Sequence, residues 1–75
     1  MMTYKGYVGQ VTYDDDDAIL YGEVVNADAA ITFIGQSVDE IRQAFHDSVD
    51  FYLRFRAEQG DAPELPRPVV EQVAS

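Results

Sequence analysis

The chain has 75 residues, with fourteen acidic and five basic side chains and a formal net charge of −9. This length allows one domain at most, and the charge disfavours direct binding to nucleic acid, whose phosphates repel an acidic surface. The sequence has no cysteine, which excludes disulfides and thiolate metal sites and fits a reducing cytoplasm. No apolar run approaches the roughly 20 residues of a membrane span. The charge either keeps a small cytoplasmic protein in solution or attracts a basic protein partner.

Three segments in the first half of the chain have the composition of β-strands. Residues 3–14 are rich in tyrosine, valine and threonine, which suit a pleated strand. Gly6 and Gly9 interrupt this segment, as is typical of a bulge or a close backbone approach. Residues 18–25 and 30–35 give two further strands. The short connections between the three segments predict an antiparallel meander.

Large apolar side chains alternate onto both faces of the predicted sheet. In the first segment, Tyr4 and Val8 are expected on one face and Tyr7 and Val11 on the other. A single helix can cover only one face of a sheet. The other face, or an open edge, is therefore expected to meet a partner or a second copy. We predict a homodimer or a higher homo-oligomer.

Four consecutive aspartates, Asp14, Asp15, Asp16 and Asp17, separate the first two strand segments. Aspartate favours turns and is disfavoured in strands, so the run predicts a hairpin connection. A calcium loop needs alternating oxygen ligands and a glycine, and a two-metal nuclease site needs carboxylates from separate elements. The run has neither property. It can be a solvated turn, an acidic contact for a partner or a metal site, and we favour the turn.

Residues 37–59 have the pattern of one amphipathic helix. Ser37 and Glu40 fit a capping box, in which each side chain accepts a hydrogen bond from the amide of the other residue. Gly60 is suited to end the helix. Apolar residues at spacings of three and four predict a stripe that packs on the sheet, formed by Val38, Ile41, Phe45, Val49 and Tyr52 and broadened by Ala44, Phe51 and Phe55.

The composition changes after Gly60. Residues 61–75 contain Pro63, Pro66 and Pro68, which predict an extended linker. A fourth strand near residues 69–73 or a tail follows. The predicted fold is α+β, a small three-stranded antiparallel meander packed on one long helix, with the order β-β-β-α-β if the last strand forms. Residues 1–60 form the domain, and residues 61–75 form the linker and the short strand or tail.

The sequence contains no pattern that is typical of a catalytic site. His46 is the only histidine, and a general base needs a nucleophile and an orienting group near it. It lies beside the predicted apolar stripe, which favours a boundary residue. A ribonuclease H type of site would have to bring together Asp14, Glu40 and Asp50. We predict no enzyme activity, no metal and no cofactor.

Several short motifs follow one another between about residues 4 and 68. No single motif is specific, but their order and spacing together are distinctive. They are Tyr4-Lys5-Gly6-Tyr7 with Gly9, Tyr13-Asp14, Gly22 with Val24, Asp28, Thr32-Phe33 with Gly35, Glu40, Ala44-Phe45, Val49-Asp50 and Tyr52-Leu53.

This series resembles the HicB antitoxins of bacterial type II toxin–antitoxin pairs. The resemblance implies a fold like a truncated ribonuclease H domain without nuclease activity. It also implies a partner, a small basic HicA toxin that cleaves mRNA and is neutralised by the bound antitoxin. Members of the family usually continue into a DNA-binding segment after the linker. Because this chain ends at Ser75, we expect operator binding to be weak or absent.

The expected partner contacts combine the acidic run with exposed aromatic side chains. Phe51 stands where the family often has another acid, and it adds apolar surface to the helix. The alternative function is a stand-alone acidic interaction module, an orphan HicB-like domain without a toxin partner. The residues predicted to bind the partner are Asp14, Asp15, Asp16, Asp17, Tyr7, Tyr21 and Phe51.

Overall fold

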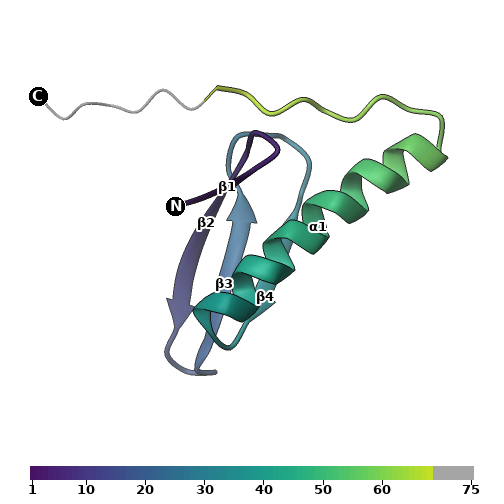
Figure 1. Ribbon diagram of the computed structural model, residues 1–75. Coiled ribbons are helices and arrows are strands. Elements are labelled where there is room, and N and C mark those ends of the chain that lie inside the picture. The colour runs from purple at the N-terminus through teal and green to yellow at the C-terminus, as the bar shows by residue number, and fades with distance from the viewer. Residues whose placement is uncertain (69–75) are drawn as a thin grey trace, which may run out of the picture.

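The computed structural model describes residues 1–68, which form one antiparallel sheet and one helix. The strands are β1 (Met2–Tyr4), β2 (Tyr7–Asp14), β3 (Ile19–Val24) and β4 (Thr32–Gly35), in the spatial order β1-β2-β3-β4, and α1 (Val38–Glu58) follows them. The helix crosses one face of the sheet (Figure 1). This confirms an α+β meander covered by one long helix. The strand expected near residues 69–73 lies outside the described residues.

The sheet has four strands before the helix rather than the predicted three, because a tight turn divides the first segment. Lys5 and Gly6 both have positive φ angles, 51° and 86°, as in the type I′ turns that suit the twist of two-residue hairpins. Tyr4 and Tyr7 are paired across this turn. They therefore lie on the same face of the sheet, and the prediction that placed them on opposite faces was wrong. Gly6 forms a turn and not a bulge.

The core lies between α1 and the face of the sheet beneath it. Phe33 packs against Phe45 with ring centroids 5.0 Å apart, and Tyr7 meets Tyr52 edge to face. Phe45 is completely buried, as predicted. Val38 is 63% exposed, so the prediction that Val38 belongs to the buried apolar stripe of the helix was wrong. The buried cluster consists of Tyr7, Val24, Ala27, Ile31, Phe33, Ile41, Phe45 and Val49.

Glycines on the helix-facing side of the sheet make room for this core. A Cβ atom built at Gly22 would overlap the ring of Phe33, which lies directly across the strand. At Gly35 a Cβ atom would come within 2.7 Å of the backbone nitrogen of Ile41. Gly22 therefore admits an aromatic ring into the core, and Gly35 lets the first turn of α1 approach the end of β4.

The ends of α1 agree closely with the prediction. Ser37 is the N-cap, and its hydroxyl accepts a hydrogen bond from the amide of Glu40 at 3.1 Å. The return bond differs from the prediction, because the Glu40 carboxylate accepts from the amide of Gln36 and not from that of Ser37. Gln59 is the C-cap, and Gly60 follows with a φ of 74°. The bond to the Ser37 hydroxyl satisfies one of the amides that the first turn of a helix leaves unpaired, and the bond from Gln36 fixes the residue before the cap.

Residues 61–68 are extended and run across one end of the sheet (Figure 1). Glu64 binds this segment to the domain through its backbone and its side chain. Its carbonyl accepts from the Tyr7 hydroxyl, and its amide donates to the Tyr52 hydroxyl. Its carboxylate accepts from the amides of Asp28 and Ala29 at 2.7 and 2.8 Å. Glu64 thereby satisfies backbone donors of the loop between β3 and β4.

Asn26 provides the second attachment and is the one buried polar residue among those described. Its side-chain oxygen accepts from the amide of Val8 at 2.9 Å, and its side-chain nitrogen donates to the carbonyls of Gly6 and Arg67. Its own carbonyl accepts from the amide of Arg67. One amide side chain thus connects the β1–β2 turn, the β3–β4 loop and residues 61–68.

Candidate protein-binding site

The connection between β2 and β3 places the four aspartates at one end of the sheet, beside the start of α1 (Figure 1). The side chain of Asp14 accepts hydrogen bonds from the amides of Asp16 and Asp17 at 3.0 and 3.4 Å. Ala18 has a φ of 55° and completes the turn. Aspartate side chains commonly stabilise turns in this way. The predicted hairpin connection is confirmed, and Asp15, Asp16 and Asp17 are exposed.

A shallow depression of about 350 Å³ lies beside this turn. Tyr13 and Tyr21 contribute aromatic surface there and are 57% and 44% exposed. Aromatic side chains beside a charged rim are suited to protein contacts, since buried anchors supply affinity and charges steer the encounter. The lining residues are Thr12, Tyr13, Asp14, Asp15, Asp16 and Tyr21.

The structure brings some of the predicted contact residues together and separates others. Tyr21 lies beside the aspartate turn, whereas Phe51 lies on α1 in a different groove. Tyr7 is only 1% exposed, and its hydroxyl is bound to the Glu64 carbonyl. Burial also raises the pKa of the Tyr7 hydroxyl. Tyr7 is therefore a core residue in this structure, and we do not retain it as a contact for a partner.

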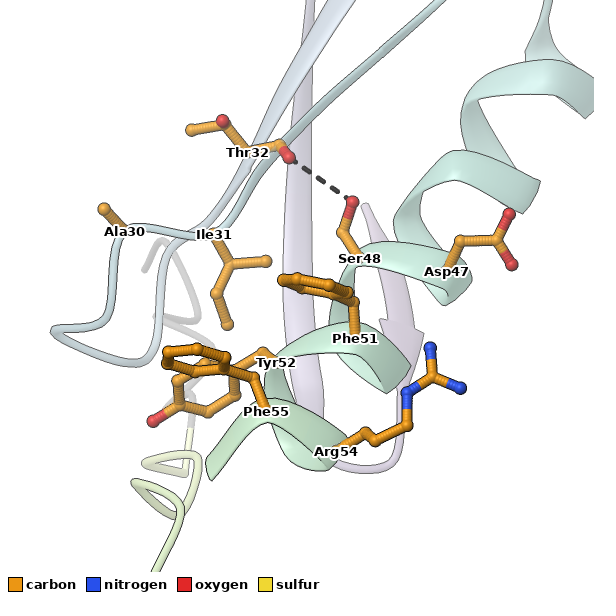
Figure 2. Close-up of a pocket in the computed structure, with 9 residues that line it drawn as sticks. All are labelled: Ala30, Ile31, Thr32, Asp47, Ser48, Phe51, Tyr52, Arg54 and Phe55. Carbon is orange, nitrogen blue, oxygen red and sulfur yellow. Dashed lines mark hydrogen bonds between the residues drawn. The ribbon is translucent and has the colours of Figure 1, made fainter. Parts of the chain in front are cut away.

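A second groove, of about 500 Å³, runs between α1 and the segment that leads into β4 (Figure 2). Phe51 and Phe55 are 62% and 47% exposed, and their rings stack with centroids 6.2 Å apart. We predicted that both would broaden the core stripe, but they lie on the flank of the helix instead. The lining residues are Ala30, Ile31, Thr32, Asp47, Ser48, Phe51, Tyr52, Arg54 and Phe55.

Sequence analysis missed three exposed residues, of which Tyr13 and Arg54 line the two surfaces and Ile34 lies outside both. Tyr13 borders the acidic run, and its place at the end of a strand was a signal that could have identified it. Ile34 is 59% exposed on the sheet face opposite the helix, where alternation from the buried Phe33 places it. Arg54 faces the second groove, and its helical spacing from Phe51 could have placed the two residues on the same flank.

Tyr4, Lys5, His46 and Asp50 form a polar cluster on the other flank of α1. The Asp50 carboxylate accepts from the Lys5 ammonium at 2.8 Å and from the Tyr4 hydroxyl at 3.0 Å. The His46 ring stacks on Tyr4 at a centroid distance of 4.1 Å. These contacts connect the β1–β2 turn to the helix. They give the cluster a structural role in the domain.

Asp50 gives a prediction about the pH dependence of stability. The hydrogen bond from Lys5 is the largest of the causes that lower the pKa of Asp50 below its ordinary value of 3.8. A carboxyl with a lower pKa when folded stabilises the fold above its unfolded pKa, and this contribution is lost as the pH falls through the folded value. We expect Asp50→Asn to reduce the free energy of unfolding at neutral pH. Urea titrations of both proteins should converge in strong acid, and a difference that persists there would contradict this explanation.

The acids that a ribonuclease H type of site would need are held apart. Glu40 is bound at the first turn of α1, and Asp50 lies ten residues further along it, which is about 15 Å at 1.5 Å per residue. Asp14 belongs to the turn between β2 and β3. Within residues 1–68 no group of three or more histidine, aspartate or glutamate side chains is arranged to hold a metal ion.

Comparison of the chain with protein-family models, with curated proteins and with solved structures gives no match. The described part of the chain has no helix that is long and apolar enough to cross a membrane. Any function must therefore be argued from the surfaces described above and from the motifs in the sequence. Of these surfaces, the aspartate turn with its two tyrosines and the groove beside Phe51 are the candidates for protein binding.

Proposed function

We propose that this domain is a cytoplasmic, HicB-like antitoxin that binds and neutralises a basic, HicA-type mRNA-cleaving ribonuclease, and that it has no enzyme activity of its own. The structural observation that supports a basic protein partner is the aspartate turn, where Asp15, Asp16 and Asp17 are exposed next to Tyr13 and Tyr21. A ribonuclease must present basic groups to RNA. An acidic surface with aromatic anchors is suited to cover those groups.

The net charge of −9 supports a basic partner independently of any motif. Opposite charges accelerate encounter, and the effect weakens as salt screens them over a Debye length of about 8 Å at physiological ionic strength. The identity of the partner rests on the motif series alone. Many of those motif residues also have roles in the fold, since Gly22 makes room for Phe33 and Asp50 anchors Lys5.

Co-expression with a toxin gene encoded next to this one tests the proposal. We expect growth to be restored in cells that express a HicA-type toxin together with residues 1–75, and we expect the two proteins to copurify. A variant with Tyr13→Lys and Tyr21→Lys tests the binding surface. If it folds, it should bind the toxin more weakly and restore less growth than the native chain. Continued arrest in the presence of soluble, folded protein would reject the antitoxin function.

The aspartate turn gives a kinetic prediction. Asp15→Asn with Asp16→Asn should lower the association rate with the toxin about tenfold at low salt, and should change the dissociation rate less. Asp14 is left intact because its side chain stabilises the turn. Surface plasmon resonance over a range of salt concentrations measures both rates.

The matched control for the double variant removes two negative charges elsewhere. Glu58→Gln with Asp61→Asn changes the net charge equally at the far end of α1, where both residues are exposed. We expect its association rate to fall by less than about twofold, because screening limits distant charges. Equal losses in the two double variants would show that only the total charge matters, which favours the alternative of a general acidic interaction module.

A further inference from the structure

The outer edge of β4 is open. The hydrogen bond from the Val24 amide to the Ile31 carbonyl fixes the alternation along the strand, so Thr32 and Ile34 direct their N–H and C=O groups away from β3. Among the described residues, one contact reaches these outward groups: the Ser48 hydroxyl donates to the Thr32 carbonyl at 3.4 Å. The strand sequence Thr-Phe-Ile-Gly has neither charge nor proline, the usual means of protecting an edge.

The groove beside this edge differs in charge from the rest of the molecule. Phe51 and Phe55 make it apolar, and its two charged residues, Asp47 and Arg54, balance each other. Arg54 forms no salt bridge with any residue from 1 to 68. The aspartate turn, in contrast, carries only negative charge. A basic partner is therefore attracted to the turn, whereas the groove can approach an identical groove without net local repulsion.

We infer that β4 and this groove form an interface with a second copy of the chain. In an antiparallel pair, the outward groups of Thr32 and Ile34 exchange hydrogen bonds with the same groups of the partner's β4, so the two sheets become continuous. The second copy also covers Phe51 and Phe55, whose exposed rings supply the apolar contact. This surface is separate from the aspartate turn, so the inference does not depend on the identity of any toxin.

The charge of each chain gives the dimer a distinctive salt dependence. Two copies with a charge of −9 repel one another over long distances, and salt screens this repulsion. Self-association through a locally neutral interface should therefore strengthen as salt rises. Binding of a basic partner should weaken over the same range. The opposite directions separate the two events in one set of measurements.

Sedimentation equilibrium of the full chain, at several protein and salt concentrations, tests the interface with two variants. Ile34→Pro removes an outward amide and leaves the bonds between β3 and β4 intact. Phe51→Lys places a charge in the groove. We expect each to raise the dimer dissociation constant at least about tenfold, or 1.4 kcal/mol. The control, Tyr21→Lys, changes the residue paired with Ile34 on the next strand, and should leave the constant nearly unchanged.

Hydrogen exchange gives a readout that does not depend on any variant. The amides of Thr32 and Ile34 should become protected as protein concentration rises, while those of β1 should not. A monomer at every concentration would overturn the inference. Loss of the dimer in Tyr21→Lys but not in Phe51→Lys would overturn it in favour of face-to-face packing of the sheets. Protection of Thr32 and Ile34 that requires a basic toxin, and not a second copy, would also overturn it.

Discussion

Asn26→Ala is expected to lower the free energy of unfolding by about 3 kcal/mol, a large part of the roughly 4–11 kcal/mol that a domain of this size has. Asn26 is 4% exposed, and its side chain makes three hydrogen bonds to the backbone. Alanine leaves the buried amide of Val8 without an acceptor, and an unsatisfied buried group costs about 1–3 kcal/mol. The carbonyls of Gly6 and Arg67 also lose their donor.

Thermal and urea denaturation measure this loss, and a reduction of roughly 12–24 °C in Tm corresponds to it for a domain of this length. Hydrogen exchange should also show faster exchange at the amides of Val8 and Arg67. Arg67→Ala is the control, because it removes an exposed side chain and preserves both backbone contacts with Asn26. Stability within about 1 kcal/mol of the native chain, with Val8 still protected, would contradict the role assigned to Asn26.

The order of the elements could be predicted because local signals were strong. The cap at Ser37, the glycine at position 60 and the regular spacing of Ile41, Phe45 and Val49 placed α1 almost to the residue. The turn at Lys5 and Gly6 was missed for a specific reason. Lysine is an uncommon residue at a positive φ. The sequence therefore did not distinguish a continuous strand interrupted by Gly6 from two strands joined by a two-residue turn.

Contacts between distant segments could not be predicted in the same way. The bonds from Glu64 to the β3–β4 loop and those from Asn26 to Arg67 join residues that are 35 to 41 positions apart. Proline content indicated that residues 61–68 are extended, but composition does not reveal which backbone groups a segment satisfies. The three-dimensional fold determines which backbone groups residues 61–68 bind, and the local sequence pattern does not predict these contacts.

The candidate site was predicted in part for a similar reason. The aspartate turn follows from composition, and Tyr21 lies beside it as strand pairing requires. Helical periodicity predicted that Phe51 and Phe55 are buried, but both are exposed. The apolar residues cover a wider arc of α1 than the sheet can bury. The width of the covered face depends on how α1 crosses the strands. The angle between α1 and the strands is known only from the folded structure.

Gly22→Ala is expected to destabilise the domain by about 2 kcal/mol, although it adds a single methyl group. The new Cβ would overlap the ring of Phe33, which is itself 5% exposed and packed on Phe45. Overpacking of this kind typically costs about 1–3 kcal/mol, and the reduced freedom of the unfolded chain offsets only about 0.4–1 kcal/mol. Gly9→Ala is the matched control on the neighbouring strand. Its Cβ would lie 3.0 Å from Phe33 and 3.1 Å from Phe45, so a small shift of the rings accommodates it at lower cost.

A double-mutant cycle with Phe33→Leu separates steric overlap from other effects of the alanine. Leucine removes the far end of the ring, so Gly22→Ala should cost about 1–2 kcal/mol less in the Phe33→Leu background, within the range seen for residues in contact. Urea denaturation of the four proteins gives this coupling energy directly. If Gly22→Ala costs the same in both backgrounds, the ring of Phe33 is not the reason for glycine at this position.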